Sequence, residues 1–358
     1  MSIVAIARPD IRALKPYSSA RMESPLMEAG GGAVLLNANE SPWPATSATG
    51  LNRYPDPQPV GLVARLAALY GVESGQVLAG RGSDEAIDLL VRAFCVAGED
   101  AIAICPPTFG MYAVCARIQN AGVIEVALTR AFDLDADALL AALTPQTKLV
   151  FLCSPNNPTA GTVPLTMIAR IATALTSRAL VVIDEAYIEF AGAASAVSLL
   201  SHFSNVAILR TLSKAHALAG ARIGALIAPA DVISLLRRIQ APYPLPTPCV
   251  DAALAALSPA GRDEADARVA AIVRERERLV PELAALPQVR AVLPSAANFL
   301  CVRFANARAT YRSLLDQGVV VRDVGEYPGL TNCLRISIGT PQENTRLLSA
   351  LSACEVAA

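Results

Sequence analysis

Lys214 lies in a stretch of small and apolar residues, "RTLSKAHALAGARIG" at 210–224, which contains few other charges. A lysine that loses water in such surroundings favours its neutral form, and the neutral amine is a nucleophile. The ordinary alternative is a lysine in a surface loop near the start of a helix. Because a single residue does not decide between these interpretations, the motifs that precede it must.

Residues 81–87, "RGSDEAI", follow a short apolar run and favour an anion site. Gly82 allows a tight turn, and Ser83 is suited to cap the helix that begins there. The backbone N–H groups of Ser83 and Asp84 face outward at the helix start, where negative charge is favoured. An ordinary capped helix without a ligand is the alternative.

Polar side chains also follow two other apolar runs. Asn157, in "SPNNPTAG", lies in a turn that the flanking prolines make rigid, so its amide can point into a cleft. Asp184, in "DEAY", ends a buried strand and needs a cationic partner there. A plain turn and a helix cap are the respective alternatives.

Pyridoxal phosphate is one ligand that satisfies all these groups at once. Its phosphate suits the helix start, and its protonated ring nitrogen suits Asp184. Its phenolate oxygen suits Asn157 and Tyr187, and its aldehyde suits Lys214. The four motifs together therefore predict a site for this cofactor.

The elements that position these motifs alternate along residues 75–228. Short apolar runs such as "KLVFLC" and "ALVVID" are typical of strands buried on both faces, and helical stretches separate them. This alternation predicts an α/β domain with a mostly parallel sheet. Ligands of such sheets bind beyond the carboxyl ends of the strands, which is where the motifs lie.

The Pro-rich segment "APYPLPTP" at 241–248 predicts a boundary between two domains. We expect an N-terminal arm at 1–45, a large cofactor-binding domain at 46–240 and a smaller C-terminal domain at 241–358. In the smaller domain, the apolar spacing predicts a long helix at 265–286 and strands at "NFLCVRF" and "CLRISIG".

The composition indicates small molecules as partners. The 358 residues carry a formal net charge of -1, and the 30 Lys and Arg residues are spread along the chain, so we expect no nucleic-acid partner. Although 53% of the residues are hydrophobic and the mean hydropathy is +0.42, no uncharged run predicts a membrane span. The N-terminal residues lack the pattern of a secretory signal, so we expect a cytoplasmic protein.

Cysteine and histidine usage argues against metal chemistry. The cysteines form no C-x-x-C pair and no cluster with histidine, so we expect reduced core residues; they are Cys95, Cys105, Cys115, Cys153, Cys249, Cys301, Cys333 and Cys354. Since His202 and His216 are the only histidines, we expect no metal site.

The chain resembles the fold-type I pyridoxal-phosphate aminotransferases, and among them the histidinol-phosphate aminotransferases. The resemblance covers nearly the whole chain, with the motifs "LNANESP", "LNRYPDPQP", "RGSDEAIDLLVRAFC", "CPPTFGMY", "SPNNPT", "DEAYIEF", "RTLSKAHALAGARIG", "APYPLPTP" and "LRISIGT". It implies a three-layer large domain with a mostly parallel sheet, a smaller α+β C-terminal domain, and an arm at 1–45 that joins the small domain and the dimer interface. It also implies a ping-pong transamination of histidine biosynthesis, between L-histidinol phosphate plus 2-oxoglutarate and imidazole acetol phosphate plus L-glutamate.

The resemblance implies roles around the cofactor ring. Lys214 would form an aldimine with the cofactor and then move a proton between the substrate Cα and the cofactor C4′. Asp184 would pair with the pyridinium nitrogen, while Asn157 and Tyr187 would bind the phenolate oxygen. Phe109 would stack on the ring, where the family often has tyrosine.

The resemblance also implies which residues bind the cofactor phosphate. That group would contact Ser213, Arg222 and the helix start formed by Gly82, Ser83 and Asp84. Tyr54 would reach the cofactor phosphate of the neighbouring subunit, which implies a homodimer.

Substrate contacts follow from the same resemblance. Arg335 would bind phosphate or carboxylate, since its planar fork matches either anion. Arg322 and Tyr17 would add contacts to the substrate phosphate, and Asn157 would also face the substrate. The alternative for Arg322 is an ion pair with Asp323 or another surface acid.

Two positions depart from the family pattern. Ala160 stands where the turn "NNPTAG" usually has glycine, which bears on the backbone geometry of that turn. His216 stands where an aromatic apolar residue is common, and we expect it to pack rather than to carry protons.

Two other functions fit the same motifs. A pyridoxal-phosphate lyase of the threonine-phosphate decarboxylase kind shares the fold and reads a substrate phosphate, and an assay for 2-oxoglutarate separates it from a transaminase. The sensor half of certain transcription regulators shares the fold without catalysis, but we expect no basic helix-turn-helix region ahead of the arm.

Overall fold

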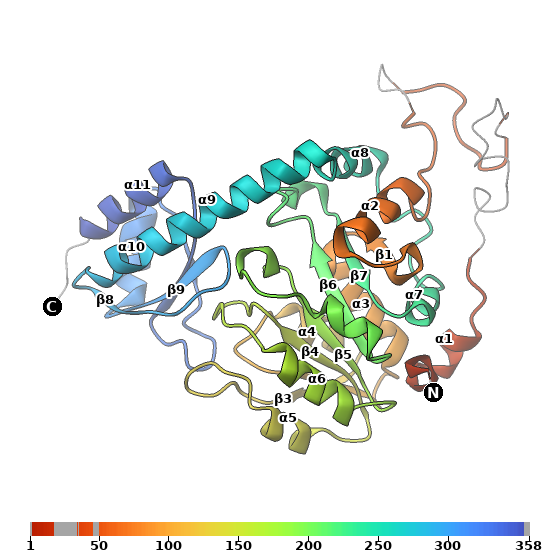
Figure 1. Ribbon diagram of the computed structural model, residues 1–358, viewed down its shortest axis with the longest axis horizontal. Coiled ribbons are helices and arrows are strands. Elements are labelled where there is room, and N and C mark those ends of the chain that lie inside the picture. Colours follow the sequence, from red (N-terminus) through yellow and green to blue (C-terminus); the bar gives the residue numbers. More distant parts are fainter. Residues whose placement is uncertain (1, 18–33, 35, 46–49, 354–358) are drawn as a thin grey trace.

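The computed structural model describes residues 2–17, 34, 36–45 and 50–353, which form two sheets with helices around them (Figure 1). The larger sheet contains β1 (Val77–Gly80), β2 (Ala101–Ile104), β3 (Gly122–Glu125), β4 (Thr147–Cys153), β5 (Leu180–Asp184), β6 (Val206–Thr211) and β7 (Gly224–Ile227). Its strand order is β1-β7-β6-β5-β4-β2-β3.

Most neighbours in the larger sheet are parallel, which confirms the predicted fold class. The strands β3, β2, β4, β5 and β6 run parallel to one another, whereas β7 is antiparallel to both β6 and β1. Residues 212–223, which join β6 to β7, contain only a short 3-10 turn, so they cannot form the crossover that a parallel pair requires.

Helices cover both faces of this sheet. The larger-sheet helices are α2 (Val60–Tyr70), α3 (Gly82–Phe94), α4 (Met111–Ile118), α5 (Ala136–Ala142), α6 (Leu165–Ala174) and α7 (Ala230–Leu236). In β5, Leu180 and Val182 pack with α3, α4 and α7, while Val181 and Ile183 pack with α5 and α6 on the other face. Because successive side chains of a strand point to opposite faces, a strand that is apolar throughout is buried between two helical layers.

The smaller sheet is antiparallel and lies at the C-terminal end of the chain (Figure 1). It contains β8 (Val289–Val292), β9 (Phe299–Phe304), β10 (Arg322–Asp323) and β11 (Cys333–Ser337), in the order β10-β11-β9-β8. The helices that accompany it are α10 (Ala307–Asp316) and α11 (Pro341–Ser352).

The long helix α9 (Pro259–Ala284) connects the two sheets and begins earlier than the predicted 265. Ser258 caps it through a hydrogen bond from the Gly261 N–H, and Pro259 occupies the first helical position, where its missing N–H has no cost. The start was missed because the first turns are polar and carry no apolar period. The helix α8 (Thr247–Ala256) precedes it, and the predicted domain boundary at 241 stays a prediction.

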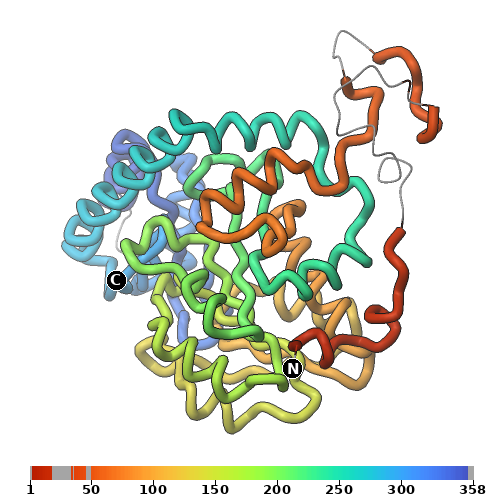
Figure 2. The backbone as a smooth tube through the Cα atoms, turned by 45° about the vertical axis from the view of Figure 1, so that its right-hand side comes forward, coloured from red at the N-terminus to blue at the C-terminus, as the bar shows by residue number. Residues whose placement is uncertain are grey.

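The first residues of the chain pack on the larger sheet domain. Ile3, in η1 (Ile3–Ile6), and Ala7 are buried in the same core as α3 and α7, and the Arg8 N–H donates to the Ala93 carbonyl at 3.0 Å. The arm was expected to join the small domain, but this part of it lies at the opposite end of the molecule (Figure 1). By contrast, residues 36–45 extend away from the body of the fold (Figure 2), and Trp43 is 76% exposed.

Among the described residues, no helix combines the length and the apolar character that crossing a membrane requires. All seven described cysteines are free thiols. Cys354 lies outside the described residues.

Candidate active site

A cavity of about 560 Å³ opens at the carboxyl ends of β4, β5 and β6, as expected for ligand sites of parallel sheets. Residues from both sheets line it. The predicted site residues in its lining are Ser83, Asp84, Phe109, Asn157, Asp184, Tyr187, Ser213, Lys214, Arg222, Arg322 and Arg335.

Asp184 ends β5 and is only 2% exposed. Its Oδ2 accepts a hydrogen bond from the Tyr112 hydroxyl at 2.7 Å, and its Oδ1 accepts from the Ala186 N–H at 3.1 Å. Burial raises the pKa of Asp184 to about 6, although the hydrogen bond from Tyr112 acts in the opposite direction. No basic side chain of the described residues forms an ion pair with this carboxylate, so a protonated nitrogen of a ligand would stabilise it.

Tyr112 was not predicted as part of the site. It lies in the first turn of α4, is fully buried, and stacks on Phe151 with ring centroids 4.7 Å apart. Its ring also meets the edge of Phe109 at 5.6 Å. The aromatic packing therefore fixes the hydroxyl that holds Asp184, and it also orients Phe109 in the wall of the cavity.

The N-terminus of α3 presents backbone N–H groups to the cavity. The first-turn N–H groups of Gly82, Ser83 and Asp84 have no acceptors within the helix. The prediction that Ser83 caps this helix is wrong: Arg81 occupies the cap position and no side chain caps it there. Glu85 instead accepts a hydrogen bond from the Arg81 N–H at 2.7 Å, so the first turn keeps its N–H groups available for an anion.

Arg222 lies directly over this helix start. Its backbone is left-handed at φ 56°, and its Nη2 lies 3.3 Å from Asp84 Oδ2. A Cβ on Gly82, whose φ is 79°, would come within 2.7 Å of Arg222 Nη2, and a Cβ on Gly224 would come within 2.5 Å of the Gly82 carbonyl carbon. These two glycines therefore let β7 and α3 approach closely enough to place the guanidinium beside the N–H groups.

Lys214 faces the same cavity, with its Nζ 5.6 Å from the centre of the Tyr187 ring. The apolar surroundings in the sequence favoured burial of Lys214, and this interpretation is wrong: the cavity opens to solvent and the side chain is exposed. Partial loss of water still lowers its pKa, and the positive charge of Arg335 lowers it further. Beside it, the Ser213 N–H donates to Thr211 Oγ1 at 3.1 Å, which fixes the turn after β6.

The two arginines of the smaller sheet face each other across neighbouring strands. Arg322 in β10 and Arg335 in β11 are direct partners in the antiparallel register, and like charges in such positions repel. Arg335 donates to the side-chain oxygen of Asn157, which joins it to the turn after β4. Paired guanidiniums that line a cavity form a site for a phosphate or a carboxylate, because an anion between them removes the repulsion.

The alternative ion pair between Arg322 and Asp323 does not form. Asp323 Oδ1 accepts a hydrogen bond from the Gly325 N–H at 2.8 Å, and no salt bridge involves Arg322 within the described part of the chain. The guanidinium therefore stays available to the cavity.

Three predicted site residues do not line this cavity, and one of them, Gly82, is buried at the start of α3 behind Arg222. The other two are tyrosines. Tyr54 is 47% exposed and stacks on Tyr243, with ring centroids 4.5 Å apart, on another face of the molecule. Tyr17 is 68% exposed and lines a separate surface hollow. Within one chain, neither residue contacts the other site residues.

Several lining residues were missed. They are Gly110, Met111, Val114, Cys153, Pro158, Ala186, Thr211, Ala219, Val324 and Tyr327. Thr211 could have been found because it is the last residue of β6, directly before the Ser213 turn. Val324 and Tyr327 carried no signal, since they reach the cavity from a loop of the smaller sheet.

The turn that contains Ala160 keeps the geometry of a glycine position. Ala160 has φ 62° and is 1% exposed. Its N–H donates to the Asn156 carbonyl at 2.7 Å, and its carbonyl accepts from the Ala296 N–H at 2.9 Å. The left-handed conformation costs alanine about 1 to 2 kcal/mol, and burial of the methyl group offsets roughly 0.8 kcal/mol of that cost.

These residues fit pyridoxal phosphate, the cofactor predicted from the sequence. The buried carboxylate of Asp184 lacks a positive partner within the described chain, and the α3 N-terminus with Arg222 provides a cradle for a phosphate. Lys214, whose pKa is lowered, lies in the same cavity. Groups suited to the ring nitrogen, the phosphate and the aldehyde of the cofactor therefore lie at one cavity.

Comparisons with known proteins agree with this arrangement. The family model "Aminotransferase class I and II" matches residues 32–351. A histidinol-phosphate aminotransferase of Stenotrophomonas maltophilia is 55% identical, over 99% of this chain and 98% of the relative, and one of Xanthomonas euvesicatoria is 54% identical over 98% and 97%. The crystal structure of histidinol-phosphate aminotransferase from Sinorhizobium meliloti in complex with pyridoxal-5'-phosphate is 29% identical with a TM-score of 0.78, covering 86% of this chain and 84% of that chain.

The raised pKa of Asp184 predicts a pH-dependent stability of the cofactor-free protein. Because the folded-state pKa of about 6 lies above the ordinary 3.8, the stability that this carboxyl contributes is present below about pH 4 and is lost as the pH rises through about 6. Between pH 4 and pH 7 we expect the free energy of unfolding of the wild type to fall, relative to that of Asp184→Asn, by up to about 3 kcal/mol. Urea unfolding at both pH values measures this difference.

The exposed Asp316 on α10 offers the matched control, since Asp316→Asn removes a carboxylate of the same kind far from the cavity. A difference between Asp184→Asn and wild type that stays constant across this pH range would contradict the interpretation that burial dominates at Asp184.

Proposed function

We propose that this chain, which belongs to the class I and II aminotransferase family, is a transaminase of histidine biosynthesis. It converts L-histidinol phosphate and 2-oxoglutarate into imidazole acetol phosphate and L-glutamate, and it also catalyses the reverse reaction. The observation that carries the proposal is the opposed pair Arg322 and Arg335 in the cavity that also contains Lys214 and Asp184. One site then holds both a cofactor cradle and a separate anion site for the substrate.

Pyridoxal phosphate, when bound, supplies an aldehyde that condenses with amines and a ring that withdraws electrons from the carbon bearing the amine. Asp184 keeps a proton on the ring nitrogen by pairing with it. Asn157 and Tyr187 hydrogen-bond the ring oxygen, and Phe109 stacks on the ring. The N–H groups at the start of α3, together with Ser213 and Arg222, hold the cofactor phosphate.

Lys214 binds the cofactor and acts as the general base. Its lowered pKa brings the neutral amine closer to neutral pH, where it would accept a proton from the substrate Cα and donate it at the cofactor C4′. The exposure of Lys214 in the cavity leaves its amine within reach of an entering substrate.

The arginine pair accounts for two substrates in one site. Histidinol phosphate carries a phosphate but no α-carboxylate, whereas glutamate carries carboxylates, so the site must bind two kinds of anion in alternate half-reactions. Arg335, fixed by Asn157, serves both substrates. Arg322, which is exposed at the cavity wall, serves mainly the more highly charged phosphate. Tyr17 lies outside the cavity of its own chain, so its contact with the substrate phosphate comes from the neighbouring subunit.

A homodimer in the cytoplasm completes the proposal. Tyr54 is 47% exposed and lies outside the cavity of its own chain. In the homodimer it contacts the cofactor phosphate of the neighbouring subunit. Small molecules are the remaining partners.

The first test is a half-reaction followed through the absorbance of the bound cofactor. The wild-type protein should change its cofactor spectrum on mixing with histidinol phosphate and regain it with 2-oxoglutarate. Lys214→Ala should fold and show no turnover, because the base that moves the Cα proton is gone. A lyase would release carbon dioxide from a phosphorylated amino acid without 2-oxoglutarate, and near wild-type turnover by Lys214→Ala would remove the lysine from its role.

We expect the Arg322 and Arg335 variants to differ in which substrate they affect. A hydrogen bond between charged groups contributes about 1.5 to 3 kcal/mol, so Arg322→Ala should weaken the binding of histidinol phosphate by roughly one to two orders of magnitude. The binding of glutamate should weaken less. Arg335→Ala should impair both half-reactions. Single-turnover measurements with each amino donor give the two values separately.

Arg308→Ala is the control for these two variants, since it removes an exposed arginine of the same sheet domain that does not line the cavity. Equal losses for histidinol phosphate and glutamate in Arg322→Ala would show that Arg322 does not discriminate between them.

Shared sites predict recovery of activity in hybrid dimers. Tyr54→Phe and Lys214→Ala each damage both sites of their own homodimer, but a mixed dimer has one site with both native residues. We expect activity to reappear after subunits of the two variants are mixed, in proportion to the heterodimer measured by native mass spectrometry. Verified heterodimers without activity would argue that Tyr54 acts within its own chain or not at all.

A further inference from the structure

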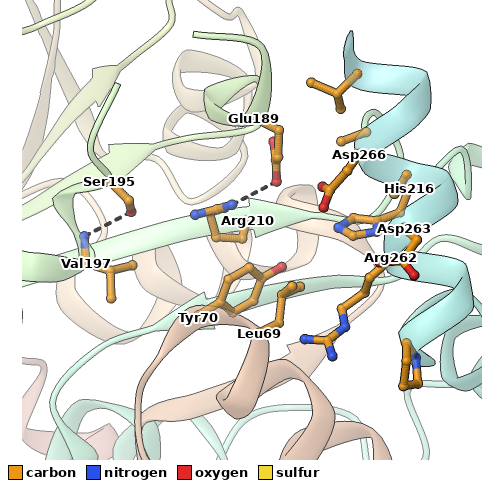
Figure 3. Close-up of a pocket in the computed structure, with 14 residues that line it drawn as sticks. Leu69, Tyr70, Glu189, Ser195, Val197, Arg210, His216, Arg262, Asp263 and Asp266 are labelled. Carbon is orange, nitrogen blue, oxygen red and sulfur yellow. Dashed lines mark hydrogen bonds and ion pairs between the residues drawn. The ribbon is translucent and has the colours of Figure 1, made fainter. Parts of the chain in front are cut away.

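A second cavity, of about 400 Å³, lies next to the residues that follow Lys214 in the chain (Figure 3). Its walls come from β6, from the end of α2, from η4 (Ile188–Phe190) and from the first turns of α9. Ala215 and His216 line it directly after the catalytic lysine. None of its lining residues belongs to the proposed active site.

Two buried nitrogen atoms in this cavity lack partners. Arg210 is 8% exposed and His216 is 7% exposed, and neither Arg210 Nε nor His216 Nδ1 has a hydrogen-bond partner among the described residues. The other nitrogens of Arg210 bond to Glu185 at 3.3 Å and to Glu189 at 2.7 Å. A buried polar atom without a partner is unfavourable. Both atoms have almost no accessible surface, so a polar ligand reaches them when the side chains around them shift.

The groups around these atoms converge on one space. Figure 3 shows the imidazole of His216 and the carboxylates of Glu189 and Asp266 directed into the gap that Arg210 and Tyr70 close from the other side. The guanidinium of Arg210 lies 4.6 Å from the centre of the Tyr70 ring, so the ring and the two glutamates hold it in place. This wall is therefore already ordered.

The charges at the cavity exclude an anion. Arg210 is neutralised by two carboxylates, which leaves Asp263 and Asp266 against Arg262. Asp263 and Asp266 are exposed on α9, and neither forms an ion pair with the described residues. The excess of carboxylate favours a small organic cation.

The unpaired nitrogens add a second requirement. Arg210 Nε is a donor, so the ligand must offer an oxygen or another acceptor. Burial lowers the pKa of His216, and a neutral imidazole both donates and accepts, which suits a hydroxyl group. We propose that this cavity is a binding site for a small cationic amino alcohol, whose ammonium group faces Asp266 and Asp263 and whose hydroxyl group bonds to Arg210 and His216.

Choline is the probe for this site, since its quaternary ammonium cannot condense with the cofactor aldehyde. Titration calorimetry on the cofactor-loaded protein should show one site per chain, with a dissociation constant on the order of a few millimolar. The neutral isostere 3,3-dimethylbutan-1-ol, which lacks the charge, and tetramethylammonium, which lacks the hydroxyl, should each bind at least about tenfold more weakly.

Variants assign the binding to this cavity. Asp266→Asn should weaken the binding of choline by about tenfold. His216→Phe should weaken it at least as strongly, because the substitution removes the imidazole and fills the space. Glu264→Gln is the matched control, since Glu264 lies on the same turns of α9 but pairs with Arg268 and does not line the cavity. Its affinity for choline should equal that of the wild type.

The proposal is overturned by any of three results: no heat with choline up to about 50 mM, equal affinity for choline and its neutral isostere, or wild-type affinity in Asp266→Asn. A crystal soaked with choline that shows ordered water only in the cavity also overturns it. The transamination assay is independent of these measurements, so failure of one proposal leaves the other to be judged separately.

Discussion

The carboxylate of Asp184 lies at the end of the central strand β5, between two helical layers that exclude water, and the site is arranged around that charge. Its position follows from strand order: β4 and β6 flank β5, with Cys153 and Leu209 opposite Asp184 in the register. The turns that carry Asn157 and Lys214 begin where those flanking strands end. A carboxylate that has no cationic partner among the described residues therefore faces the same space as the amide and the amine.

Holding this charge requires packing at a distance from the cavity. The hydroxyl of Tyr112 is fixed by stacking on Phe151, a residue of β4, so the inner face of the sheet determines the hydrogen bond to Asp184. The proposed phosphate site likewise depends on packing, because Gly224 lets the backbone of β7 pass close to the start of α3. In both places a residue that contacts no ligand sets the geometry of one that does.

The site residues identified without the family resemblance share a property: they lie at the end of an apolar run or within a few residues of it, as Asp184 and Asn157 do. The end of a strand can be recognised in the sequence, and a parallel sheet brings the ends of its strands together in space. Tyr112 was missed because its contact with Asp184 joins a helix to a strand 72 residues away, and nothing local distinguishes it from a core tyrosine. The docking of Ile3 was missed for a similar reason, since η1 is too short to show a period.

The segment after β6 separates two cavities of opposite character. Lys214 lines the first cavity, where Arg222, Arg322 and Arg335 provide positive charge, whereas His216 lines the second, where carboxylates of α9 prevail. Phosphates are therefore favoured in the first cavity, and cations without an anionic group are favoured in the second. One short segment contacts both cavities, and the prevailing charge on each side favours a different class of ligand.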